Sequence, residues 1–137
     1  MGQAIFNNNR LCVIDRNTIE TLKEKAKSLP THSYRLCLHH NVSDPIQEMI
    51  IALTRDSFIK PHRRPEGIKT YNLIEGEMDV YFFEDNGDCF KKISLGALAS
   101  GKPCMFRLSG GLYHMRVPKT DVVVFHAQDI SHRAYTY

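Results

Sequence analysis

The sequence contains no tryptophan and no run of apolar residues long enough to cross a membrane. Its first residues, MGQAIFNNNR, lack the basic region and the following apolar region of a secretory signal peptide. The net charge is only +3, from 18 basic and 15 acidic residues, and the basic residues are scattered along the chain, so no nucleic-acid-binding surface is indicated. We therefore expect a cytoplasmic protein with neither a membrane nor a nucleic acid as its partner.

Cysteine is also scarce, with four residues that form no CxxC pair and no zinc-finger spacing. Three of the four have apolar or strand-like neighbours, so we expect reduced and mostly buried thiols. The chain has 137 residues, of which 42% are apolar and 24% are charged. These values are typical of one globular domain with a core of its own.

A change of pattern near residue 15 divides the chain. Residues 1–14 are polar at first and are predicted to form an N-terminal arm with a short strand at 11–14. Residues 15–30 carry apolar side chains at helical spacing, with Asn17 and Glu20 in a capping-box pattern and Pro30 as the terminator. The sequence therefore predicts one helix, packed on the domain formed by residues 31–137.

From residue 31 onward the apolar residues recur with a period of two, which is typical of strands. Asn86-Gly87 lies between two strand-like runs and predicts a tight hairpin of the primed type. About nine short strands joined by glycine, proline and asparagine turns favour a sandwich or a barrel. The predicted strands are 34–40, 46–54, 58–60, 71–75, 78–84, 89–95, 104–108, 112–117 and 122–128.

Two stretches carry the candidate chemistry. His62, Arg64 and Lys69 come just before the strand that begins at Tyr71, and an extended backbone would place His62 and Arg64 on one face. His114 follows a glycine-rich turn in a second stretch. Histidines that arrive on strands from tight turns indicate a site in the mouth of a small β-barrel.

These stretches resemble the two sequence motifs of the cupin superfamily. In the first motif, G-x5-H-x-H-x4-E-x6-G, His62 and Gly76 match, whereas Asp56, Arg64 and Lys69 replace the first glycine, the second histidine and the glutamate. In the second motif, P-x-G-x2-H-x3-N, Gly111 and His114 match, whereas Ser109 and Pro118 replace the proline and the asparagine. The resemblance implies a mainly β cupin-type barrel, also called a double-stranded β-helix or jelly roll, with one N-terminal α-helix.

The flanking sequences resemble the WbuC family of cupin-fold proteins, which are often associated with gene clusters for O-antigen or other surface polysaccharides. The similar segments are 34–39, 44–47, 51–53 and 61–66, and the resemblance covers about residues 13–128. It implies a role in carbohydrate biosynthesis and a homodimer, because many of the proteins it resembles are dimers.

The departures from the first motif argue against tight metal binding. A cupin metal site would use positions 62, 64, 69 and 114, and only His62 and His114 remain able to bind a cation. The positive charges of Arg64 and Lys69 would repel one. No cofactor is therefore expected, although His39, His40 or His126 could supply the missing ligands of an unusual metal site.

The same substitutions favour an anion. His62, His114, Arg64 and Lys69, with Arg35, His39 and Arg116 nearby if the cupin barrel is kept, would attract a small anionic ligand, for example a nucleotide-linked sugar. By analogy with metal-independent cupin-fold isomerases and epimerases, His62 or His114 would move a proton, with Tyr71 or Tyr113 as acid.

Two other hypotheses stay open beside this enzyme: a non-catalytic cupin that binds a small ligand at a decayed metal site, and a metal-binding cupin with an unusual ligand set. Simpler interpretations apply to single residues. Arg64 and Lys69 would then pair with glutamates on the surface, and a backbone carbonyl would satisfy His114. The sequence does not decide which of His39, His40, His126 and His132 face the interior.

Overall fold

The computed structural model describes residues 3–57, 59–63, 67–109 and 111–129. Arg64, Glu66 and His132 lie outside these residues, and so does residue 58 of the predicted strand 58–60, whose residues 59 and 60 are described and form no strand. The described elements are β1 (Gln3–Phe6), α1 (Arg16–Ser28), β2 (Ser33–Cys37), β3 (Ile46–Leu53), β4 (Ile68–Glu75), β5 (Glu77–Phe83), β6 (Cys89–Gly96), the 3-10 helix η1 (Leu98–Ser100), β7 (Met105–Ser109), β8 (Tyr113–Pro118) and β9 (Val122–Asp129).

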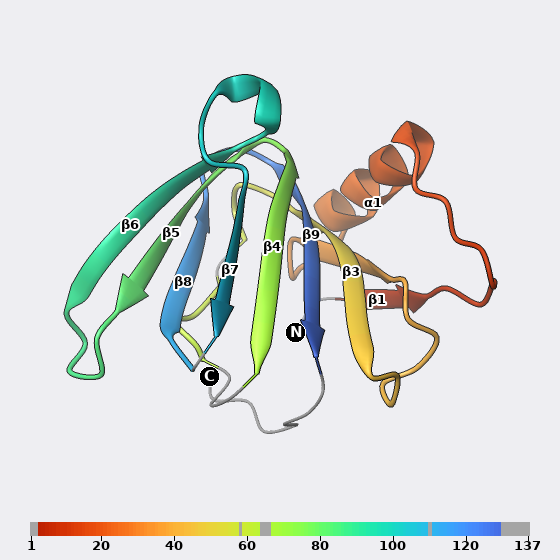
Figure 1. Ribbon diagram of the computed structural model, residues 1–137. Coiled ribbons are helices and arrows are strands. Elements are labelled where there is room, and N and C mark those ends of the chain that lie inside the picture. The colour runs from red at the N-terminus through yellow and green to blue at the C-terminus, as the bar shows by residue number, and fades with distance from the viewer. Residues whose placement is uncertain (1–2, 58, 64–66, 110, 130–137) are drawn as a thin grey trace.

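The strands form two sheets that pack face to face as a jelly roll (Figure 1). The larger sheet has six strands in the order β1-β2-β3-β9-β4-β7, and the smaller has three in the order β6-β5-β8. The ladder of the larger sheet is antiparallel except for β1, which runs parallel to β2. The two sheets do not join into a closed barrel, which refines the prediction of one.

Alternation along the strands divides the apolar residues between two cores. The first core lies between the sheets and holds residues of β3, β4, β5, β6 and β9, including Tyr71, Met78 and Val80, which have 0% of their surface exposed. The second core lies under α1, where Leu22 and Ala26 pack on Ile50, Ala52 and Val123 of β3 and β9. The helix therefore covers the outer face of the larger sheet and leaves the space between the sheets to the candidate site.

The helix begins two residues earlier than the capping-box pattern predicts. Its N-cap is Asp15, whose carboxylate accepts hydrogen bonds from the backbone N and the Oγ1 of Thr18, each at 2.9 Å. The prediction that Asn17 caps the helix is wrong. Leu29 is the C-cap and Pro30 follows it, so the predicted end of the helix is confirmed within one residue.

Two further local predictions differ from the structure. The arm forms its strand at Gln3–Phe6 rather than at 11–14. Gly87 has a positive φ of 94°, but Asn86 is not among the described residues with positive φ, so the turn is not of the type I′ form. The N–H of Gly87 instead donates to the carbonyl of Glu84 at 2.9 Å, as in a three-residue hairpin loop that ends in a left-handed glycine.

The cysteines are free, but only Cys37 is buried, whereas Cys89 is exposed. The expectation of mostly buried thiols is therefore wrong, because Cys89 begins the edge strand β6, whose first residues face solvent. The described helices include none that is both long and apolar enough to span a membrane.

Candidate functional site

Two histidines from distant parts of the chain meet between the sheets. His62 and His114 form an isolated antiparallel bridge, in which His62 N donates to His114 O at 2.9 Å and His114 N donates to His62 O at 3.0 Å. Their ring centroids are 4.4 Å apart. His62 is 4% exposed and His114 is 0% exposed, so both imidazoles lie in the interior. The structure thus brings together the two histidines that match the cupin motifs.

A second backbone contact orients each of these rings. The Nδ1 of His62 lies 2.9 Å from the carbonyl oxygen of Lys60, and the Nδ1 of His114 lies 3.0 Å from that of Leu112. A carbonyl only accepts hydrogen bonds, so each Nδ1 carries the proton, and the neutral ring of His114 keeps a buried lone pair on Nε2 that has no partner among the described residues. The interpretation of His114 as satisfied by a backbone carbonyl therefore accounts for only one of its two nitrogens.

A third histidine and a tyrosine extend the cluster. His126 on β9 is 7% exposed and stacks on the ring of Tyr71, with centroids 4.4 Å apart. Tyr71 also lies edge-on to His114 at 6.1 Å. The register of β4 and β9 pairs Tyr71 with His126, so the fold fixes this contact.

Basic side chains enter the same interior. Arg116 alternates with His114 on β8, and its Cζ lies 4.8 Å from the centroid of the Tyr71 ring. Lys69 alternates with Tyr71 on β4 and is 3% exposed. Arg35 shares a face of β2 with buried Cys37, and its Nη1 lies 3.4 Å from the Sδ of Met49.

Burial and positive charge keep the three imidazoles neutral. Burial, together with smaller effects of the nearby Lys69 and Arg116 charges, lowers the pKa of His62 to about 4. Burial and the neighbouring His62 lower the pKa of His114 to about 3, with Lys69 and Arg116 again contributing. The pKa of His126 falls well below its usual value because of burial, then of Arg116, Lys69 and Arg35. Lys69 and Arg116 are thus close enough to affect all three rings.

Several buried polar atoms of this cluster have no hydrogen-bond partner among the described residues. They are the Nε2 atoms of His114 and His126 and the Nε and Nη1 atoms of Arg116. Each such atom costs about 1–3 kcal/mol of stability when it is left unpaired. We refer to these four atoms as the open polar set.

The donor set does not fit a metal ion of the cupin kind. Within the described ranges, no group of three histidine, cysteine, aspartate or glutamate side chains is placed to hold a metal. His62 and His114 supply two neutral nitrogens, but Lys69 and Arg116 lie close by, and their charges oppose a cation. His126 faces Tyr71 rather than completing a third ligand position.

The other predicted site residues lie elsewhere. His39 is buried, but its Nδ1 lies 3.1 Å from the backbone N and the carbonyl oxygen of Glu48, and its ring packs edge-on against Phe6. Exposed His40 places its Nε2 3.0 Å from the carbonyl oxygen of Asn9. Tyr113 lies on the opposite face of β8 from His114, and the guanidinium of Arg63 covers its ring at 4.4 Å. Tyr113 is therefore not placed to act as the acid.

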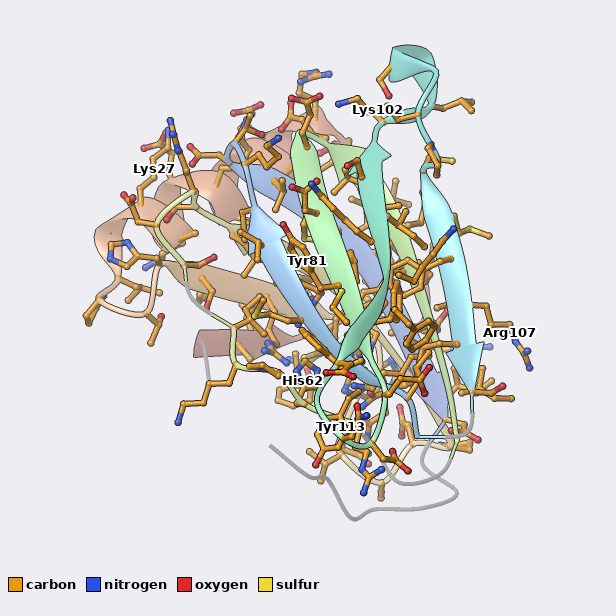
Figure 2. The ribbon with its side chains drawn as sticks, turned by 90° about the vertical axis from the view of Figure 1, so that its left-hand side faces the viewer. Lys27, His62, Tyr81, Lys102, Arg107 and Tyr113 are labelled. Carbon is orange, nitrogen blue, oxygen red and sulfur yellow. The ribbon has the colours of Figure 1, made fainter. Side chains whose placement is uncertain are left out.

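Figure 2 shows His62 and Tyr113 near the same end of the molecule, while Arg107 points away from the body of the fold.

Sequence reasoning missed Gln128, which is 8% exposed and pairs with Lys69 in the ladder of β4 and β9. The signal was present, because Gln128 continues the alternation of Val122, Val124 and His126, whose side chains are all buried.

Solved structures with the same fold include oxalate oxidase in complex with the substrate analogue glycolate, at a TM-score of 0.59 and 16% identity, over 80% of this chain and 57% of that chain. Salicylate 1,2-dioxygenase from Pseudoaminobacter salicylatoxidans matches at a TM-score of 0.61 and 13% identity, over 85% of this chain and 33% of that chain. A cupin superfamily protein from Desulfitobacterium hafniense matches at a TM-score of 0.53 and 15% identity, over 69% of this chain and 76% of that chain. The chain thus spans little more than half of the oxalate oxidase that it matches.

These neighbours confirm the predicted fold: the chain is a cupin-type jelly roll with one N-terminal helix. Residues 14–95, more than half of the chain, match the family described as Domain of unknown function (DUF6016), and the chain belongs to this family. No curated protein matches it.

Proposed function

We propose that the protein binds a small anionic metabolite between its two sheets, at the cluster of His62, His114, Lys69 and Arg116. The observation that carries the proposal is the guanidinium of Arg116, whose Nε and Nη1 are buried and have no hydrogen-bond partner among the described residues. Both nitrogens are charged donors that need acceptors, which the oxygens of a carboxylate or a phosphate supply. The histidines beside this guanidinium are neutral at pH 7, so the positive charge of the cluster comes from Lys69 and Arg116.

Direct binding tests the proposal. Calorimetric titration and thermal denaturation would be measured with inorganic phosphate, lactate, glucose 1-phosphate and UDP-glucose, because a ligand selective for the folded state raises its stability by mass action. We expect at least one of these anions to bind. We expect Arg116→Gln to weaken that binding by about tenfold or more, since it removes a charge-assisted pair of hydrogen bonds.

Arg107→Gln is the matched control, because Arg107 is an exposed residue on β7 and the substitution removes the same charge. Arg107→Gln should bind as the wild type does. The proposal fails if none of the four anions binds, or if the two arginine variants lose affinity equally. It also fails if Mn²⁺ or Zn²⁺ binds tightly at one ion per chain through His62 and His114.

A second candidate function is acid–base catalysis on the bound anion. The observation that favours it is the neutral imidazole of His114, whose Nδ1 is fixed as a donor and whose Nε2 has no partner among the described residues and can take a proton from the ligand. Tyr71, between His126 and Arg116, would act as the acid and donate its own phenolic proton, which the proton held by the histidine replaces after each turnover. Exchange of a ligand carbon-bound proton for solvent deuterium, followed by NMR, tests this. Exchange that survives both His62→Asn and His114→Asn would exclude it.

The finer identity of the ligand is also part of the proposal. The sequence resembles the WbuC family, and a nucleotide-linked sugar carries both a diphosphate for the basic residues and hydroxyl groups for the imidazoles. We therefore propose a role in carbohydrate biosynthesis, with the protein acting as a homodimer in the cytoplasm. Sedimentation of the purified protein at several concentrations would test the dimer.

A further inference from the structure

The open polar set surrounds one aromatic ring. The guanidinium carbon of Arg116 lies 4.8 Å from the centroid of Tyr71, His126 stacks on the same ring at 4.4 Å, and His114 approaches it at 6.1 Å. His114 is 0% exposed, so no solvent reaches its Nε2 in this arrangement. Arg116 and His114 also lie two residues apart on the same face of β8. Both side chains therefore lie beside the ring of Tyr71 on the interior side of β8.

The atoms of the open polar set need different hydrogen-bond partners, because some are donors and others are acceptors. The Nε and Nη1 of Arg116 are donors and need an acceptor. The Nε2 of His114 is an acceptor, because Nδ1 of the same ring donates to the carbonyl of Leu112 at 3.0 Å. A purely anionic ligand, which only accepts hydrogen bonds, would satisfy Arg116 and leave the lone pair of His114 buried without a partner.

We infer that the ligand carries a hydroxyl group close to its anionic group, with the anion on the guanidinium of Arg116 and the hydroxyl hydrogen donated to Nε2 of His114. This inference rests on the proposed function and narrows it from anions in general to hydroxylated anions. Hydroxy-carboxylates and sugar phosphates share this chemistry.

Matched pairs of small molecules test the inference. Lactate is compared with propionate, and glycerol 3-phosphate with n-propyl phosphate, because each second member lacks the hydroxyl group or groups and keeps the anionic group. Affinities are measured by calorimetry for the wild type, for His114→Asn and for His40→Asn. Asparagine keeps an N–H for the carbonyl of Leu112 and removes the Nε2 acceptor, and His40 is an exposed control.

The imidazole nitrogens are followed directly in the same samples. Long-range proton–nitrogen NMR spectra distinguish a bare Nε2 from one that accepts a hydrogen bond. In the wild type we expect one hydroxylated member to bind about tenfold more tightly than its partner, as one added hydrogen bond allows. The Nε2 resonance of His114 should move with that member and not with its partner. His114→Asn should reduce the preference to less than about twofold, and His40→Asn should keep it.

The pair that shows the preference identifies the source of the anion. Equal binding within both pairs, with an unmoved His114 resonance, overturns the inference and leaves the proposed anion-binding function intact. A preference that persists unchanged in His114→Asn also overturns it. If no member of either pair binds, and phosphate, glucose 1-phosphate and UDP-glucose also fail to bind, both the inference and the proposed function are refuted.

Discussion

Lowering the pH from 7.5 to 5.0 should destabilise the protein strongly through its interior histidines. In the unfolded chain a histidine has a pKa of 6.5, whereas the pKa is about 4 for His62 and about 3 for His114 in the folded state. Between these values the unfolded state binds protons that the folded state does not bind. The contribution of these two histidines to the free energy of unfolding is therefore fully present above pH 6.5. It is lost as the pH falls towards the folded-state pKa values of about 4 for His62 and about 3 for His114.

The size of the effect follows from these pKa values. At pH 5 the unfolded chain gains about 2 kcal/mol from protonation of His62 and about 2 kcal/mol from His114 relative to the folded state, each to order of magnitude. His126 acts in the same direction. The pKa values of Asp15 and Glu77 are lowered too, but carboxylates contribute mainly below about pH 5. The window from pH 6.5 to 5 therefore reports chiefly on histidines.

Urea denaturation at half-unit intervals of pH measures this directly, with the midpoint and slope fitted at each pH. His114→Asn should lower the pH dependence of the unfolding free energy by about 2 kcal/mol between pH 7.5 and 5, whatever its effect on stability at pH 7.5. His40→Asn, at an exposed position, is the control. The reasoning is refuted if stability is flat across the window, or if the two variants change the pH dependence equally.

Three further predictions concern the fold. Gly76→Ala should lower the unfolding free energy by at least about 2 kcal/mol in urea denaturation, because Gly76 has a φ of 92° and a Cβ there would meet the carbonyl oxygen of Asp121; Gly87→Ala, also at positive φ but in open space, should cost less. Asp15→Ala should cost about 1 kcal/mol of stability in the same assay, and a larger loss from Asn17→Ala would contradict the assigned N-cap. Leu73→Ala, at a position 2% exposed, should lower the unfolding free energy by about 2–5 kcal/mol, whereas a similar loss on truncating Leu98, 81% exposed, would count against the described core.

The fold could be predicted because its signals are local and repeated. Alternation from residue 31 onward locates most of the strands, and Pro30 marks the end of the helix. The errors fall where two local signals compete. Asp15 and Asn17 both suit an N-cap, and only the position of the first helical turn on the sheet decides between them. Similarly, β1 is a strand of only four residues that forms because β2 offers it a pairing edge, which local composition does not show.

The prediction of the site from the sequence depended on the residue at which β4 begins. The sequence predicts a strand from Tyr71, so Lys69 had no assigned face, whereas β4 begins at Ile68 and its alternation carries Lys69 into the interior beside Tyr71. Arg116 had the clearest signal, since it follows His114 by two residues on one strand. The meeting of His62 with His114 could be expected from the resemblance alone, because their separation in sequence is long and no local pattern joins them.

The charges that lower the histidine pKa values and the charges that would attract a ligand are the same groups. Lys69 and Arg116 disfavour the imidazolium forms of His62 and His114 by repulsion. A bound anion would cancel part of that repulsion and raise the pKa of His62, so by linkage a proton taken up by His62 would tighten anion binding. A metal ion would do the opposite, since it competes with protons for the same nitrogens. Affinity that rises as the pH falls from 7 to 5 therefore distinguishes the two kinds of ligand by the sign of a single measurement.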